Sequence, residues 1–198
     1  MSKIIAFTGA GGTGKTTVAE ALSNNVPSMV DYLRKNFYGS TAHYGDLTSI
    51  DEIIRFQYGI LFGQYIAELL TISNIDEDVA IVPIERSSID YAAYMLNQSD
   101  FIMTKKKYTE KQSCIKHYVE QCIEHANKNY DGIVYFPTGM FEPADKDGSS
   151  KERDNKSINK TDSYIKSLIT RVNVPVLQLK SKEVKSRVKA VKQFAKLL

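Results

Sequence analysis

The chain has 198 residues, a mass of 22.3 kDa, 42% hydrophobic residues and a net charge of +3. This length predicts one domain over 1–198, and the mild positive charge suits an anionic ligand without requiring nucleic acid. The two cysteines form no C-x-x-C pair, which argues against a disulfide, and the three histidines are scattered, which argues against a zinc site. There is no signal-like start and no apolar run long enough to predict a membrane span. We therefore expect a cytoplasmic protein.

The first element is a predicted β-strand over 3–8, followed by a glycine-rich turn that reads G-x-x-x-x-G-K-T. The glycines leave backbone N–H groups free to surround a phosphate chain, and a helix-like run follows with its positive end toward the same anion. Lys15 is expected to reach the β- and γ-phosphates, and the Thr16 hydroxyl to ligate Mg²⁺. The sequence therefore predicts a site for ATP and Mg²⁺ built from Gly9, Ala10, Gly11, Gly12, Thr13, Gly14, Lys15, Thr16 and Thr17.

Short apolar runs alternate with helical periodicity along the rest of the chain. Further strands are predicted at 26–30, 79–84, 132–136 and 174–179, and helices at 49–73, from 91, at 109–127, 163–171 and 182–198. Strands that alternate with helices predict an α/β fold with a mostly parallel five-stranded sheet covered on both faces. The polar residues 142–162 are predicted to form a mobile loop, and about 142–156 of it a lid.

The second candidate motif is Glu85-Arg86-Ser87, which follows the apolar strand at 79–84. Ligands bind at the carboxyl ends of strands in a sheet of this kind, so these side chains are expected to face the γ-phosphate. Glu85 would accept the proton of an attacking hydroxyl, or hold Mg²⁺ through water. Arg86 would clamp a phosphate or stabilise the charge that develops during phosphoryl transfer.

The segment from Glu85 to Tyr91 resembles the D/E-R-S segment of deoxyribonucleoside and thymidylate kinases. It is even more similar to the D-R-x-x-x-D-x-x-A-Y segment of the nicotinamide-riboside-kinase-like ATPases, since Asp90, Ala93 and Tyr94 fall in step. Asp31-Tyr32-Leu33-Arg34 resembles the E-Y-x-R segment of that group, and Tyr130 to Pro137 resembles the strand that precedes its lid. Glu85 stands where the group more often has Asp.

The resemblance implies a three-layer P-loop kinase fold and an ATP-dependent phosphotransferase. It places Gln57 where such kinases often carry a glutamine that contacts a nucleobase, and it implies that Asp31, Arg34 and Arg86 contact the acceptor. Arg153 is the one arginine of the serine- and lysine-rich lid, so it is the candidate lid residue for catalysis.

We interpret the chain as a kinase that transfers the γ-phosphoryl group of ATP to a nucleoside, a nucleotide or a related hydroxyl. One alternative is a bacteriophage kinase that phosphorylates 5-hydroxymethyluracil in DNA, with which the Asn-, Lys- and Tyr-rich composition is compatible. Another alternative is a nucleotide-dependent switch ATPase. DNA as a substrate and a homodimer stay open, and a membrane partner is not expected.

Overall fold

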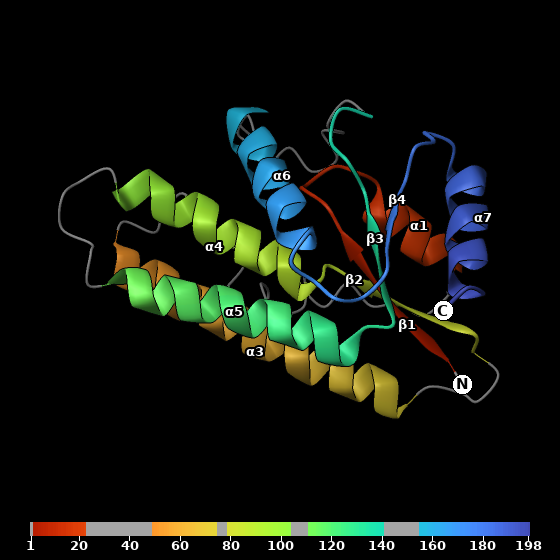
Figure 1. Cartoon of the computed structure of the whole chain (residues 1–198), viewed down its shortest axis with the longest axis horizontal. Helices are drawn as coiled ribbons and strands as arrows, with labels where there is room; N and C mark the ends of the chain where they lie inside the picture. Colours follow the sequence, from red (N-terminus) through yellow and green to blue (C-terminus); the bar gives the residue numbers. More distant parts are fainter. Residues whose placement is uncertain (1, 23–48, 75–78, 104–110, 141–154) are drawn as a thin grey trace.

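The computed structural model describes residues 2–22, 49–74, 79–103, 111–140 and 155–198. In chain order its elements are β1 (Lys3–Thr8), α1 (Lys15–Leu22), α3 (Ile50–Ser73), β2 (Ile81–Glu85), α4 (Ser88–Met103), α5 (Gln112–Asn129), β3 (Gly132–Tyr135), α6 (Asn155–Ile169), β4 (Val176–Gln178) and α7 (Val184–Ala195). The described strands form one parallel sheet in the order β2-β1-β3-β4 (Figure 1). The α/β fold is confirmed. The described sheet has four strands where five were predicted, and the predicted strand at 26–30 lies outside the described residues.

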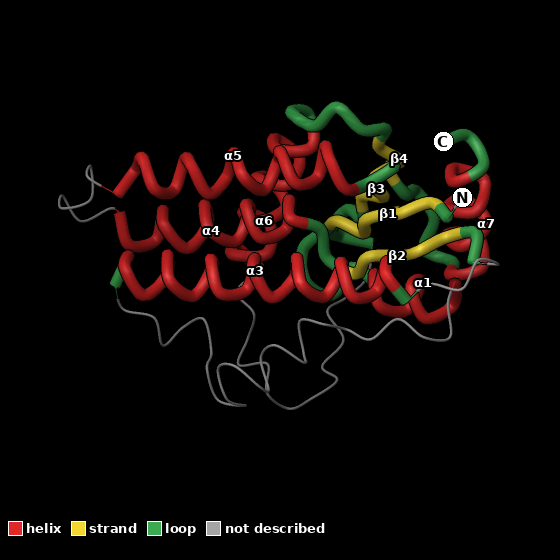
Figure 2. The backbone as a smooth tube through the Cα atoms, turned by 90° about the horizontal axis from the view of Figure 1, so that it is seen from below, coloured by secondary structure: helices red, strands yellow, loops and turns green. Residues whose placement is uncertain are grey.

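The sheet separates two hydrophobic cores, which gives the predicted three layers. Successive residues of a strand point to opposite faces, so β1 sends Ala6 into one core and Ile5 and Phe7 into the other. The Ala6 side is covered by α3, α4, α5 and α6, and the other side by α1 and α7. Figures 1 and 2 show α7 set apart from the long helices α3, α4 and α5, which run beside one another.

Proline 83 lies within β2, although proline cannot donate to a sheet ladder. The Lys3 N–H donates to the carbonyl of Ala80, and backbone groups of a strand alternate in direction, so Pro83 turns its nitrogen away from β1. Since β2 is the outer strand of the described sheet, no ladder bond to a described strand is lost.

Helix α6 begins at Asn155, eight residues before the predicted helix at 163, so the prediction of a loop over 155–162 was wrong. Thr161 and Asp162 are buried on the inner face of α6, in line with Ile165 and Leu168. Because these two buried residues are polar, the hydrophobic periodicity of the helix is not recognisable over its first half. Asp162 accepts a hydrogen bond of 2.8 Å from the Tyr135 hydroxyl, which explains its burial. The last two residues of the predicted lid therefore belong to this helix, and the rest of the lid lies outside the described residues. None of the described helices combines the length and the apolar character that a membrane crossing requires.

Candidate functional site

The glycine-rich turn lies at the carboxyl end of β1 and leads directly into α1. Gly12 and Gly14 have φ values of 76° and 84°, a left-handed conformation that favours glycine. Lys15 is only 4% exposed, and its Nζ donates to the carbonyls of Gly9 at 2.6 Å and Ala10 at 2.8 Å. The ammonium group is therefore held inside the curve of the loop, beside the backbone that would surround a phosphate chain.

Two residues predicted to hold the metal lie in contact. The Thr16 hydroxyl, exposed in the first turn of α1, donates to Glu85 Oε1 at the end of β2. Both offer oxygen atoms, the ligands that Mg²⁺ prefers, and Mg²⁺ usually completes its shell with waters and phosphates. Within the described ranges no group of three or more His, Cys, Asp or Glu side chains could hold a metal. The donor set fits a magnesium ion that arrives with its nucleotide.

Arg86 adopts a left-handed backbone, with φ of 73°, which among the described residues no other non-glycine residue shares. Such a conformation costs roughly 1–2 kcal/mol for a residue with a Cβ. Its Nη1 donates to the Tyr94 hydroxyl at 2.7 Å, and the guanidinium lies 5.6 Å from the centre of that ring. A strained backbone that is held in place marks a position where geometry matters.

The fully buried carboxylate of Asp90 joins the two motifs. Its Oδ1 accepts from the Gly9 N–H and its Oδ2 from the Ser87 N–H, both at 2.8 Å. The hydroxyls of Ser87 and Thr8 are also hydrogen-bonded to each other. Burial raises the pKa of Asp90, while the nearby charges of Lys15 and Arg86 and the two N–H donors oppose that shift. The sequence predicted no role for Asp90, although its place in the D-R-x-x-x-D pattern was the available signal.

Arg187 of α7 was missed by the sequence analysis, which placed it in a basic closing helix. It is 1% exposed, and it donates from Nη1 to the carbonyl of Thr13 at 2.8 Å and from Nε to the carbonyl of Ser181 at 2.6 Å. The guanidinium also lies 5.5 Å from the centre of the Phe136 ring, and burial lowers its pKa. Arg187 therefore supports the tip of the phosphate loop from the α1 and α7 side of the sheet.

Gln57 is fully buried on α3, and its Nε2 donates to Gln98 Oε1 at 2.8 Å. Its Oε1 has no hydrogen-bond partner among the described residues. The other predicted contacts to the acceptor, Asp31 and Arg34, and the lid residue Arg153 lie outside the described residues. The structure therefore brings Lys15, Thr16, Glu85 and Arg86 to one edge of the sheet, while the acceptor contacts stay predictions.

A cavity of about 280 Å³ lies between the phosphate loop and the start of α6. Its lining residues are Gly11, Gly12, Thr13, Pro137, Thr138, Gly139, Met140, Asn155, Ile158 and Asn159. It is large enough for part of a nucleotide.

A phosphate loop after the first strand, with an acidic residue at the end of the neighbouring parallel strand, defines a P-loop nucleotide-binding fold. The chain belongs to the AAA domain family, whose model matches residues 4–187. No curated protein matches the chain.

The solved structures support the same fold. A deoxyadenosine kinase from M. mycoides with bound dATP shares 16% identity with a TM-score of 0.68, over 96% of this chain and 97% of that one. The same kinase with bound dCTP has 14% identity and a TM-score of 0.53, over 98% and 100%. NadR in complex with NAD and AMP-PNP has 14% identity and a TM-score of 0.62, over 98% of this chain and 49% of that one. The predicted P-loop kinase fold is confirmed.

Proposed function

We propose that the protein transfers the γ-phosphoryl group of ATP to a hydroxyl group of a nucleoside or nucleotide. The observation that carries the proposal is the contact of Thr16 with Glu85, which joins the phosphate loop to a carboxylate beside Arg86. A carboxylate and a guanidinium next to the site of the γ-phosphate are the groups that phosphoryl transfer needs.

In this reaction a bond forms between the acceptor oxygen and the γ-phosphorus, and the bond from that phosphorus to the β,γ-bridging oxygen breaks. Glu85 takes the proton of the acceptor hydroxyl, and ADP leaves. Lys15 and the loop N–H groups hold the phosphates, while Arg86 stabilises the negative charge that spreads over the transferred group. Mg²⁺ would be held by Thr16, and through water by Glu85 where Glu85 is a metal ligand rather than the base, and it would neutralise phosphate charge.

The names of the solved neighbours support a small-molecule acceptor of the nucleoside class, because one is a deoxyadenosine kinase with dATP and another is NadR with NAD. We propose that Asp31, Arg34 and Gln57 contact this acceptor and that Arg153 acts from the lid. A modified base in DNA, a bacteriophage source and a homodimer stay predictions.

The test is a panel of nucleosides, nucleotides and DNA containing 5-hydroxymethyluracil, each incubated with labelled ATP and magnesium. We expect a phosphorylated product with one acceptor class, and ATP consumption that is slow without it, since a kinase must exclude water from the site. Lys15→Ala is the control, because it removes the cation and leaves the loop amides in place.

A second candidate function is a nucleotide-dependent switch ATPase, which the match to the AAA domain family favours. It predicts fast ATP hydrolysis with no acceptor and no phosphorylated product in any pool. That result would replace the kinase proposal with the switch.

A further inference from the structure

In the turn that carries Arg86, three successive residues each have one backbone group bonded to a buried side chain. The carbonyl of Arg86 accepts from Gln64 Nε2 at 3.4 Å. The N–H of Ser87 donates to Asp90 at 2.8 Å, and the N–H of Ser88 donates to the Tyr130 hydroxyl at 3.1 Å. The left-handed conformation of Arg86 is therefore fixed from α3, from α4 and from the residue that ends α5.

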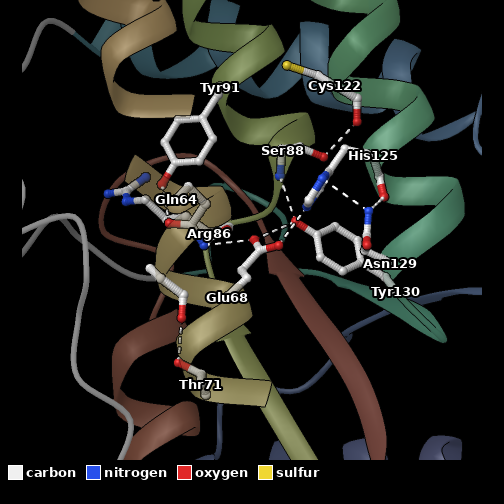
Figure 3. Close-up of polar contacts among 11 residues, drawn as sticks. Gln64, Glu68, Thr71, Arg86, Ser88, Tyr91, Cys122, His125, Asn129 and Tyr130 are labelled. Atoms are coloured by element: carbon white, nitrogen blue, oxygen red, sulfur yellow. Dashed lines mark hydrogen bonds and ion pairs between the residues drawn. The ribbon is translucent and has the colours of Figure 1, made fainter. Parts of the chain in front are cut away.

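Two of these three side chains are tied together by Glu68 of α3 (Figure 3). Its Oε1 accepts from Gln64 Nε2 at 2.9 Å and from the Tyr130 hydroxyl at 2.8 Å. Its Oε2 lies 2.6 Å from His125 Nε2. The carboxylate is 4% exposed, so one buried anion holds both groups that bind the turn on either side of Ser87.

The two side chains that bind Glu68 from α5 and α3, His125 and Gln64, are themselves held by further contacts. The Asn129 amide nitrogen lies 3.1 Å from His125 Nδ1, so Nδ1 accepts and Nε2 carries the hydrogen that faces Glu68. The imidazole also stacks on Tyr65, with ring centres 3.9 Å apart. Tyr91 donates to Gln64 Oε1 at 3.0 Å, so the Gln64 amide uses both its donors and its acceptor.

A buried polar network of this kind is a poor way to gain stability. Apolar side chains of similar volume hold helices together at least as well, because burying a carboxylate is costly. A fully bonded network does, however, fix one geometry among the alternatives. Here the geometry that it fixes is the strained turn that carries Arg86.

We propose that Glu68 and Gln64 are positioning residues for Arg86, and that they hold its left-handed turn so that the guanidinium faces the transferring phosphoryl group. This inference rests on the proposed kinase function. It concerns residues of α3, outside both the phosphate loop and the Glu-Arg-Ser segment, and it assigns Tyr130 and His125 to the support of Glu68.

The variants are Glu68→Gln and Gln64→Leu, and the matched control is Asp162→Asn. Asp162 is also a buried carboxylate that accepts from a tyrosine hydroxyl, yet it lies on α6 and contacts Tyr135 and Lys166. We expect Glu68→Gln and Gln64→Leu to lower kcat by about tenfold or more, with the KM for ATP within about threefold, because misplaced groups lose rate more than affinity. The control is expected to keep its kcat within about threefold.

A double-mutant comparison with Arg86 distinguishes loss of Arg86 positioning from a general loss of structure. In an Arg86→Lys background, Glu68→Gln should lower kcat by less than about twofold, because the group that it positions is already altered. An equal loss in both backgrounds, or an unchanged kcat in both single variants, would overturn the proposal.

Hydrogen exchange gives a readout that does not depend on activity. In both variants the N–H groups of Ser87 and Ser88 should exchange faster than in the wild type, while exchange in the control is unchanged. If the wild type phosphorylates no acceptor, the proposed function fails while this measurement still decides the inference, and unchanged exchange would overturn it. If Glu68→Gln does not fold, Gln64→Leu carries both tests, since it removes only the bonds made by the Gln64 amide.

Discussion

Replacing Arg187 with methionine tests whether a helix at the far end of the chain supports the phosphate loop. Methionine keeps most of the length of the side chain but donates nothing, so the carbonyls of Thr13 and Ser181 lose the bonds that Arg187 makes. Each of these two carbonyls costs about 1–3 kcal/mol when left unpaired, and loss of the contact with Phe136 adds about 0.5–1 kcal/mol. Relief from burying a charge offsets part of this loss, so we expect a net destabilisation of about 2–4 kcal/mol.

For a chain of this size that loss lowers Tm by roughly 5–15 °C. Thermal unfolding measures it, and titration with a fluorescent ADP analogue should show affinity weakened by about tenfold or more, because the loop tip is less well fixed. Lys189→Met is the matched control, since it removes a cation from the exposed face of the same helix and should change stability by less than about 0.5 kcal/mol. If Arg187→Met behaved like this control in both measurements, the claim that Arg187 supports the loop would be refuted.

Three further predictions concern Lys15, Glu85 and Asp90. Lys15→Ala should lower the steady-state rate of phosphoryl transfer on the order of 10³-fold and leave the fold intact. A rate within about tenfold of wild type would show that Lys15 does not bind the phosphates. Glu85→Gln should lower kcat by roughly 10²–10⁴-fold with near-normal nucleotide affinity if Glu85 is the base, whereas an equal loss of magnesium-dependent ATP affinity would make it chiefly a metal ligand. Because the folded-state pKa of Asp90 is raised, its contribution to stability is greatest below the ordinary carboxyl pKa and is lost as pH rises through the raised value. In denaturant unfolding at several pH values, the free energy of unfolding of Asp90→Asn should therefore depend less on pH than that of the wild type. An unchanged pH dependence would contradict a raised pKa for Asp90.

The sequence predicts those parts of the fold that depend on local pattern. The G-x-x-x-x-G-K-T turn and the strands at 3–8, 79–84, 132–136 and 174–179 follow from local pattern. The position of Glu85 at the same edge of the sheet as the phosphate loop follows from the edge at which parallel strands end.

What the sequence could not predict depends on contacts between distant residues. Arg187 binds Thr13 across 174 positions, and Glu68 meets Tyr130 across 62, so no local window contains either pair. The start of α6 was missed because Asp162 takes an inner position that an apolar residue would normally fill. The left-handed backbone of Arg86 could not be predicted either, since arginine has no preference for this conformation.

The first glycine of the phosphate loop has a second reason to be glycine. A Cβ on Gly9 would lie 2.5 Å from the carbonyl oxygen of Phe136 and 3.0 Å from its Cβ. The side of Gly9 that this Cβ would occupy is thus closed by the end of the neighbouring strand, whether or not a phosphate is bound. In a descendant that no longer bound nucleotide, a side chain at position 9 would still meet this close contact with Phe136. Retention of that glycine alone is therefore poor evidence of activity, and Lys15, which we propose binds the phosphates, is the residue whose loss would record the change.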